Sequence, residues 1–337
     1  MKAVVIEEPG KFAVRSVDDP TPGELDAIVK VEACGICGTD IHVLHGEFAP
    51  TRYPIVPGHE FCGEVVAVGS EVGNLSVGDF VAVDPSLFCG HCRMCRLGRF
   101  NLCENWNAVG VGSVNGACAE LVRVPSASAF SVGADFPRHW ATLVEPLSCA
   151  VHGLDQFGPK PADDYLIYGA GTMGLLLAQL IKHNGAGGLD MVETNTKRHQ
   201  LAKRLAADRV AVSADELDRP QGWDVVIDAT GVVAAIEDGL RRVGRGGTFL
   251  MFGVARSDAT ARISPFRVYN DEIRIIGSMA VLHSFERALA LFEKGVVDSE
   301  AMITNRFPLD DYSKAIDAFL SGSGLKVQVA PAVNAGS

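Results

Sequence analysis

The chain has 337 residues, of which 47% are hydrophobic and 21% are charged. This composition is typical of a folded soluble protein with room for two domains, and it excludes wholesale disorder. The 41 acidic and 30 basic side chains give a formal net charge of -11. We therefore expect no nucleic-acid partner, because proteins that bind nucleic acids present a basic surface.

The sequence has no segment typical of a membrane anchor or a secretory signal. The longest uncharged apolar stretch, residues 166–181, has 16 residues, and about 20 are needed to cross a bilayer. Only four apolar residues separate Lys2 from Glu7, too few for the apolar core of a signal peptide. All nine cysteines lie at or before Cys149, which favours thiolate chemistry in a reducing compartment over a disulfide framework. We expect a cytoplasmic protein with no membrane partner.

The first 124 residues alternate short strand-like runs with Gly, Pro and Asp, a pattern that predicts a small, irregular β-barrel with long loops. The expected strands are residues 3–6, 27–31, 63–68, 80–83 and 120–124.

A dispersed set of metal-binding residue types falls in and just after this region. The set comprises Cys37, His59, Glu60 and Glu145. One thiolate, one imidazole and one or two carboxylates can bind zinc and leave a position open, as catalytic zinc requires. Spacing alone only suggests this site, because the same residues are also common as buried thiols, core histidines and surface acids.

Four further cysteines stand within 15 residues of one another: Cys89, Cys92, Cys95 and Cys103. This spacing can wrap one tetrahedral zinc, and a site of four sulfurs has no open position, so it predicts a structural zinc. Arg93, Arg96 and Arg99 are interleaved with the cysteines, where they can offset the negative charge of the thiolates. The alternatives are reduced, unliganded cysteines and an iron–sulfur cluster, which the final spacing and the lack of a following proline disfavour.

From Tyr165 onwards, strand patterns are separated by helical ones, which predicts a doubly wound parallel sheet. Residues 173–181 have the apolar spacing of an amphipathic helix. The six expected strands are residues 165–168, 189–193, 209–212, 223–228, 248–253 and 273–278.

A dinucleotide-binding fingerprint follows the first of these strands and opens the helix. It runs through Gly169, Gly171, Thr172, Met173 and Gly174. The glycines permit a tight turn and close approach of the backbone to a pyrophosphate, and free N–H groups at the helix start attract the phosphates. The alternative is a glycine-rich turn in a nucleotide-free or methyltransferase-type sheet.

The choice between NAD and NADP is predicted from the end of the next strand. Glu193 ends that strand 19 residues after Gly174, where a carboxylate accepts hydrogen bonds from the adenosine ribose and repels a 2′-phosphate. Lys197 and Arg198 are counter-evidence, since a nearby cation can hold that phosphate. We expect NAD, with NADP as the alternative.

Two helical patterns, at residues 285–292 and 312–319, close the chain. They are too few to form a core alone, so we expect them to dock on the N-terminal barrel and the nucleotide domain to be an insertion. The expected domains are residues 1–147 and 284–337, which form the catalytic domain, and residues 148–283, which bind the nucleotide.

Five segments of the sequence together resemble one known family. They are Gly35-Ile-Cys-Gly-Thr-Asp40, Pro57-Gly-His-Glu60, the four-cysteine lobe, Glu145-Pro-Leu147 and the glycine-rich fingerprint. They occur in the order seen in zinc-dependent medium-chain alcohol dehydrogenases, and the resemblance covers nearly the whole chain. It is greatest to the branch of sorbitol, arabinitol and threonine dehydrogenases, where glutamate stands at the position of Glu145. The resemblance implies an α/β fold with a GroES-like β-barrel catalytic domain, an inserted Rossmann domain, two zinc ions per chain, and a homotetramer or homodimer.

The resemblance also assigns roles to individual residues. It implies that Cys37 and His59 bind the catalytic zinc, and that Glu60, Glu145 or a water held by one of them completes the shell. Zinc would lower the pKa of the substrate hydroxyl before hydride passes to the nicotinamide.

Three residues are expected to act around the substrate. The resemblance implies that Thr39 contacts the substrate oxygen and that His42 passes the released proton onward. Arg306 resembles an arginine that approaches the substrate in sugar-alcohol enzymes, and is equally consistent with a surface ion pair.

The expected function is NAD-dependent oxidation of a secondary hydroxyl on a polyol or its phosphate, with reduction of the ketose as the reverse reaction. Oxidation of threonine or of simple secondary alcohols is the alternative within the same chemistry. Two other readings are disfavoured: a zinc-free quinone reductase does not need the cysteines, and a binding protein without turnover does not need Cys37, His59, Thr39 and His42 together.

Overall fold

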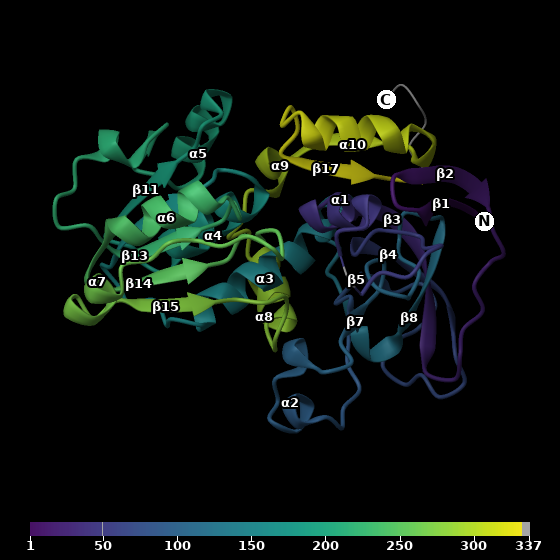
Figure 1. The fold of residues 1–337 in the computed structure, drawn as a ribbon. Helices are drawn as coiled ribbons and strands as arrows, with labels where there is room; N and C mark the ends of the chain where they lie inside the picture. The colour runs from purple at the N-terminus through teal and green to yellow at the C-terminus, as the bar shows by residue number, and fades with distance from the viewer. Residues whose placement is uncertain (49, 332–337) are drawn as a thin grey trace. The chain divides into compact units, whose positions relative to one another are not determined.

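The computed structural model describes residues 1–48 and 50–331. The chain forms two compact units (Figure 1). Unit 1 comprises Met1–Ser148, Val281–Glu293 and the chain from Ser299 onwards, and unit 2 comprises Cys149–Ala280 and Lys294–Asp298. Unit 2 is therefore an insertion into unit 1. No helix within the described residues is both long and apolar enough to span a membrane.

Unit 1 is built on a seven-stranded sheet in which β3 is the central strand. Strand β3 pairs antiparallel with β4, β8 and β17, and β16 adds to β17 in parallel. The strands of this sheet are β3 (Asp26–Gly35), β4 (Glu60–Val68), β5 (Phe80–Val83), β8 (Leu121–Pro125), β9 (Ala129–Ser131), β16 (Ile303–Phe307) and β17 (Lys326–Val329). Two small sheets accompany it, β1 (Lys2–Glu8) with β2 (Lys11–Ser16) and β6 (Ser86–Leu87) with β7 (Asn107–Ala108).

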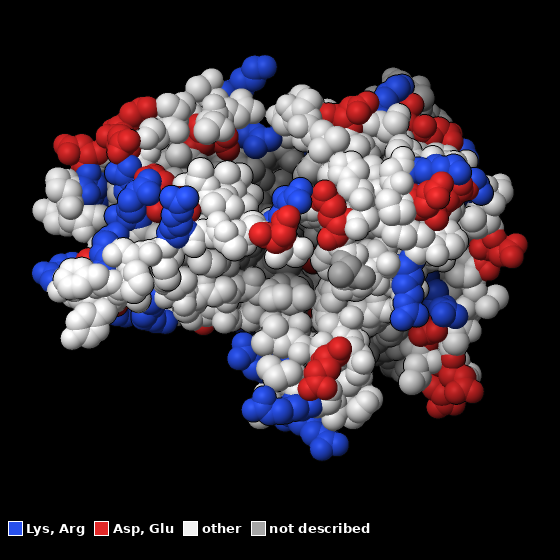
Figure 2. Space-filling model, in the orientation of Figure 1, with Lys and Arg blue, Asp and Glu red and all other residues white. Residues whose placement is uncertain are grey.

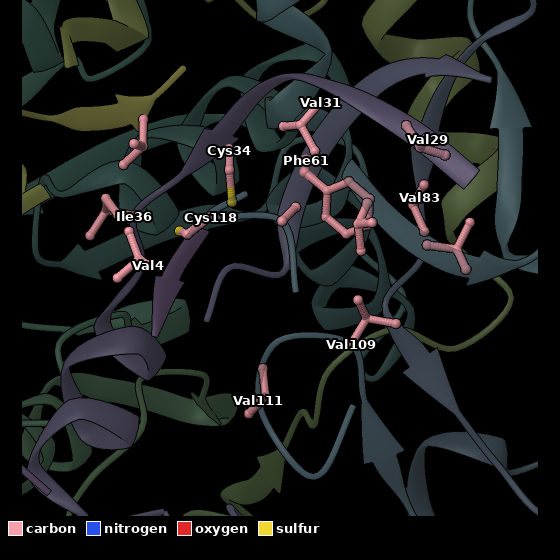
Figure 3. Close-up of a cluster of buried hydrophobic side chains, with 14 of the residues drawn as sticks. Val4, Val29, Val31, Cys34, Ile36, Phe61, Val83, Val109, Val111 and Cys118 are labelled. Atoms are coloured by element: carbon pink, nitrogen blue, oxygen red, sulfur yellow. The ribbon is translucent and has the colours of Figure 1, made fainter. Parts of the chain in front are cut away.

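The core of unit 1 lies against the apolar faces of these strands (Figure 3). Val29 and Val31 of β3, Phe61 of β4 and Val83 of β5 are all buried in it. Burial of each such side chain stabilises the fold by about 1.5–3 kcal/mol. The same sheet carries the residues of interest at the ends of β3 and β4, so this core holds their backbone in place.

Unit 2 is a six-stranded parallel sheet of order β12-β11-β10-β13-β14-β15. Counted along the chain, this is the order of a Rossmann sheet, with its crossover point next to the first strand. The strands are β10 (Asp164–Tyr168), β11 (Gly188–Val192), β12 (Arg209–Ala211), β13 (Trp223–Asp228), β14 (Val243–Met251) and β15 (Arg274–Gly277). The prediction of a doubly wound parallel sheet is therefore confirmed.

Helices connect the strands of unit 2 and flank the sheet of unit 1 (Figure 1). In chain order they are α1 (Gly38–His45), α2 (Arg93–Arg96), α3 (Val144–Asp155), α4 (Thr172–His183), α5 (His199–Leu205), α6 (Val233–Arg242), α7 (Pro265–Asn270), α8 (Phe285–Glu293), α9 (Ser299–Met302) and α10 (Tyr312–Leu320).

The C-terminal part of the chain contributes strands as well as the expected helices. Helices α8 and α10 match the two helical patterns, while β16 and β17 are additions that the pattern did not predict. Strand β17 pairs with the end of β3, where Gln328 lies opposite Gly35 and Val329 opposite Cys34. This pairing brings the last strand beside the turn that contains Cys37.

Candidate metal centres and cofactor site

Cys37 stands at the junction between β3 and α1, as the residue that precedes the helix. Its backbone N–H donates to Asp40 Oδ2 at 2.8 Å, which caps the first turn of α1. Thr39 lies in the same turn, with its Oγ1 3.8 Å from Cys37 Sγ. The thiol and the hydroxyl are thus presented side by side by one tightly capped turn.

His59 and Glu60 lie at the start of β4, and both are buried. The preceding Gly58 has φ of +100°, and a Cβ there would lie 2.6 Å from Cys34 Sγ, so the close approach requires glycine. Cys37, His59 and Glu60 each offer one ligand atom, and these atoms all lie within 4.8 Å of one another. The structure therefore brings together a thiol, an imidazole and a carboxyl group, a donor set that fits zinc.

Asp40 lies close to the His59 ring. Its Oδ1 is 3.4 Å from His59 Nδ1. Burial lowers the pKa of His59, but the Asp40 carboxylate and the Cys37 thiol outweigh it and raise that pKa well above its ordinary value. Asp40 stands in the motif of residues 35–40, but no pattern there marks it as a neighbour of His59.

Glu145 lies in the first turn of α3 and is 8% exposed. It does not belong to the compact group formed by Cys37, His59 and Glu60 among the described residues. Burial raises the pKa of Glu145 to about 7, an effect that His59 opposes and the Glu60 carboxylate adds to. Glu60 therefore belongs to the group of candidate ligands. Glu145 lies outside that group, but the charges of His59 and Glu60 affect its pKa.

Lys326 of β17 contacts this group, and the sequence motifs did not predict it. Its ammonium donates hydrogen bonds to Glu60 Oε2 and, at 3.4 Å, to the carbonyl oxygen of Ile36. The Lys326 side chain is 2% exposed and that of Glu60 is 1% exposed. No local pattern in the sequence marks this lysine, because its partner lies 266 residues away.

The two remaining residues expected near the substrate lie on different elements. His42 is on α1, where its Nδ1 lies 2.8 Å from Glu47 Oε2. Arg306 is on β16, where its Nη2 lies 3.6 Å from Glu32 Oε1. This contact favours the ion-pair interpretation of Arg306 over a substrate role.

The four cysteines of the lobe form a second candidate metal group. Their sulfur atoms all lie within 4.8 Å of one another. Backbone N–H groups of Cys92 and Cys95 donate to the sulfurs of Cys89 and Cys92, each at 3.4 Å. Backbone hydrogen bonds lower the pKa of Cys89 to about 6, whereas burial and neighbouring thiols raise that of Cys95 to about 12. Four sulfurs placed this closely can bind one cation as thiolates, and the set fits a tetrahedral zinc.

The lobe is attached to the rest of unit 1 by a small aromatic contact. Phe100 stacks on Phe88 with ring centroids 4.3 Å apart and meets His283 edge-on at 5.3 Å. The Nε2 atom of His283 lies 3.0 Å from the carbonyl oxygen of Gly98. The arginines expected to offset the thiolates are exposed, and basic side chains gather over the region of α2 (Figure 2).

The glycine-rich loop of unit 2 joins β10 to α4. Gly169 has φ of +96°, and a Cβ at Gly174 would overlap the carbonyl oxygen of Gly169, so both positions require glycine. Gly171 is the residue before α4, and Thr172 and Met173 form the half-buried start of that helix. The loop thus leaves the N-terminus of α4 open to a phosphate.

Glu193 follows β11 and lies against this loop. Its Oε2 accepts a hydrogen bond from Ala170 N at 2.7 Å, and its Oε1 accepts one from Asn195 N at 2.7 Å. Each carboxylate oxygen has a second lone pair, so Glu193 can still accept from a ribose hydroxyl. Arg198 Nη1 lies 3.9 Å from Glu193 Oε2 and 3.8 Å from the Cβ position of Gly171. The structure therefore brings together the glycines, Glu193 and Arg198.

Unit 1 thus carries two zinc-type donor sets and contains a Rossmann sheet as an insertion. The family model for the alcohol dehydrogenase GroES-like domain matches residues 23–134, and the model for zinc-binding dehydrogenases matches residues 172–294. The chain belongs to the zinc-binding alcohol dehydrogenase family.

Among its relatives are polyol and threonine dehydrogenases. The chain is 38% identical to D-arabinitol dehydrogenase 1 of Uromyces fabae, over 98% of this chain and 97% of the relative. It is 36% identical to D-altritol 5-dehydrogenase of Agrobacterium fabrum and 34% identical to L-threonine 3-dehydrogenase of Shewanella frigidimarina, in each case over 92% of this chain and 94% of the relative. These relatives place the chain in the polyol and threonine dehydrogenase branch, as the sequence motifs predicted.

One similar solved structure contains a bound nucleotide. A protein of Sinorhizobium meliloti 1021, solved in complex with NADP, superposes with a TM-score of 0.94 and is 36% identical, over 98% of this chain and 99% of that one. The comparison supports the fold and a nicotinamide nucleotide as the cofactor class.

Proposed function

We propose that this protein oxidises a secondary hydroxyl of a polyol, or of a polyol phosphate, with NAD as the hydride acceptor, and reduces the ketose in the reverse direction. The observation that carries the proposal is the buried group of Cys37, His59 and Glu60, found in a chain whose relatives include two polyol dehydrogenases. Such a donor set has room for a substrate oxygen beside three protein ligands.

Cys37, His59 and Glu60 would hold the catalytic zinc, with Glu145 as the alternative carboxylate. A zinc ion there supplies a Lewis acid that lowers the pKa of the substrate hydroxyl. Asp40, whose Oδ1 lies 3.4 Å from His59 Nδ1, would orient the His59 ring and leave its other nitrogen for the metal. The four lobe cysteines would hold a second, structural zinc.

Thr39 and His42 would handle the substrate proton. The Thr39 hydroxyl lies beside Cys37; it would accept the proton of the substrate hydroxyl and release its own toward the cofactor ribose. The half-buried His42 would pass a proton on to solvent, with Glu47 holding its ring through Nδ1.

Glycines 169, 171 and 174, together with Thr172 and Met173, would bind the pyrophosphate of NAD, and Glu193 the adenosine ribose. Arg198 lies over this loop, and the NADP-bound relative keeps NADP as the alternative cofactor. We also propose a cytoplasmic homotetramer or homodimer, on the basis of the cysteine usage and the family resemblance.

Replacing Glu193 with alanine should raise the KM for NAD about tenfold and increase the relative use of NADP, because the ribose loses an acceptor and a 2′-phosphate no longer meets a carboxylate. The measurement is kcat/KM for both cofactors with one alcohol substrate. Glu216→Ala, at an exposed acidic residue of the same unit, serves as the control. An unchanged ratio of NAD to NADP use in Glu193→Ala would count against the ribose role.

The proposed substrate class is tested by following the absorbance of the reduced nicotinamide across a panel of alcohols. The panel contains pentitols, hexitols, their phosphates, inositols, threonine and simple secondary alcohols, each with NAD and with NADP. We expect the highest kcat/KM for one polyol or polyol phosphate with NAD. A highest value for threonine would support the alternative that the threonine dehydrogenase relatives suggest. Absence of turnover in protein that holds two zinc ions would overturn the substrate class.

A further inference from the structure

The side chain of Lys326 is the one buried ammonium that touches the candidate metal ligands within the described part of the chain. Lysine is rarely buried unless it is paired, and here the pair is with a carboxylate that belongs to the ligand group. The ammonium bonds only one oxygen of Glu60, Oε2. In the proposed centre the other oxygen, Oε1, would be the one left for the metal.

The backbone around this pair is shaped to hold it. Ile36 N donates to Val327 O at 2.8 Å, while the Lys326 ammonium bonds the carbonyl of Ile36, so that β17 is fixed to the turn before Cys37. A Cβ at Gly35 would overlap Glu60 Oε2 and lie 3.3 Å from Lys326 Cδ. Only glycine at position 35 therefore leaves space for the two side chains to meet.

The charges around this pair also favour it. A Zn²⁺ ion bound by the Cys37 thiolate and the Glu60 carboxylate would be formally neutralised by these two ligands. The buried ammonium adds a positive charge beside Glu60, so its removal would leave the centre more anionic.

We propose that Lys326 is a positioning residue of the metal centre: by holding Oε2 of Glu60 it limits Glu60 to a single-oxygen ligand and keeps one coordination position open. The proposal rests on the metal centre of the proposed function, but not on its substrate. Without the ammonium, both oxygens of Glu60 are free to bind the metal, the centre becomes more anionic, and the open position is closed.

A purely structural ion pair predicts the opposite effect on the metal. Loss of a residue that merely supports a ligand loosens the site and weakens metal binding about 10–100-fold. Our proposal predicts instead that metal binding tightens when Lys326 is neutralised, since a positive charge leaves and an oxygen ligand is gained. The direction of the change therefore separates the two accounts.

The test uses the protein with cobalt(II) in place of zinc and needs neither substrate nor NAD. Visible bands that disappear in Cys37→Ser identify the catalytic centre. In Lys326→Met we expect these bands to lose about half their intensity or more, because band intensity falls as the coordination number rises, and the metal to leave for a chelator several-fold more slowly. Lys326→Arg, which keeps the charge, and Lys314→Met, at an exposed lysine, should retain the spectrum and the rate.

Lys326→Met leaves the buried Glu60 carboxylate without its ammonium partner, which is costly to the fold. Two further variants therefore keep the test decisive if Lys326→Met does not fold. Lys326→Gln should weaken the bands and slow metal release, as expected for Lys326→Met. The double variant Lys326→Met/Glu60→Gln removes both charges, so it should fold, and it should bind the metal more weakly than the wild type. Unchanged bands, or faster metal release in Lys326→Met or Lys326→Gln, would overturn the proposal. A wild-type protein without the cobalt bands would instead overturn the metal centre of the proposed function.

Discussion

Replacing Cys37 with serine should lower kcat/KM by at least about a thousandfold, because a Lewis acid at the substrate oxygen contributes several kcal/mol to the transition state. The fold should remain, since the capping bond of this turn is made by the backbone N–H of residue 37 to Asp40. NAD binding should remain as well, because its expected residues lie in unit 2. The measurements are steady-state kinetics, zinc content, thermal unfolding and nucleotide binding.

Cys149→Ser is the matched control, because Cys149 belongs to neither cysteine-containing metal group among the described residues. It should keep its activity and both zinc ions. Retention of activity in Cys37→Ser would refute the catalytic zinc assignment, whereas loss of nucleotide binding would show that the variant acts through the fold.

Replacing Cys95 with serine should remove the second zinc and lower the free energy of unfolding by about 4 kcal/mol, the range associated with loss of a bound metal. This corresponds to a fall of roughly 10 °C in the midpoint of thermal unfolding. The lobe would be held only by contacts such as Phe100 with His283, so a protease should cleave it first. The measurements are thermal unfolding, zinc content and limited proteolysis.

Leu97→Ser, a change at an exposed residue of the same lobe, should leave stability and zinc content unchanged. The activity of Cys95→Ser should fall much less than that of Cys37→Ser, because the four-sulfur group has no open position for substrate. An unaltered melting temperature with both zinc ions retained would contradict the structural role.

The parts of the fold that local patterns encode could be predicted from the sequence. The expected strands 80–83 and 223–228 coincide with β5 and β13, because short apolar runs are bounded there by turn residues. The expected strand 248–253 starts at Val243 in the structure, since the glycine-rich residues 244–247 lack the side chains that mark a strand. Strands β16 and β17 were missed because their pairing with each other and with β3 is decided by tertiary contacts.

In the candidate sites, too, residues that are close in the sequence could be predicted, and residues brought together by tertiary contacts could not. The four lobe cysteines are local in the sequence and meet in one group, as their spacing suggested. For the dispersed set, spacing suggested Glu60 and Glu145 equally, and only the structure separates them, with Glu60 in the group and bound to Lys326. The contacts of Asp40 with His59 and of Lys326 with Glu60 depend on the way β3, β4 and β17 converge, which no linear pattern records.

The zinc content of the purified protein, measured together with its rate of NAD reduction by the best polyol, tests the account most directly. We predict two zinc ions per chain, and a rate that disappears when a chelator removes the zinc held by Cys37, His59 and Glu60 and returns when zinc is restored. Full activity in protein that contains no zinc would contradict the account.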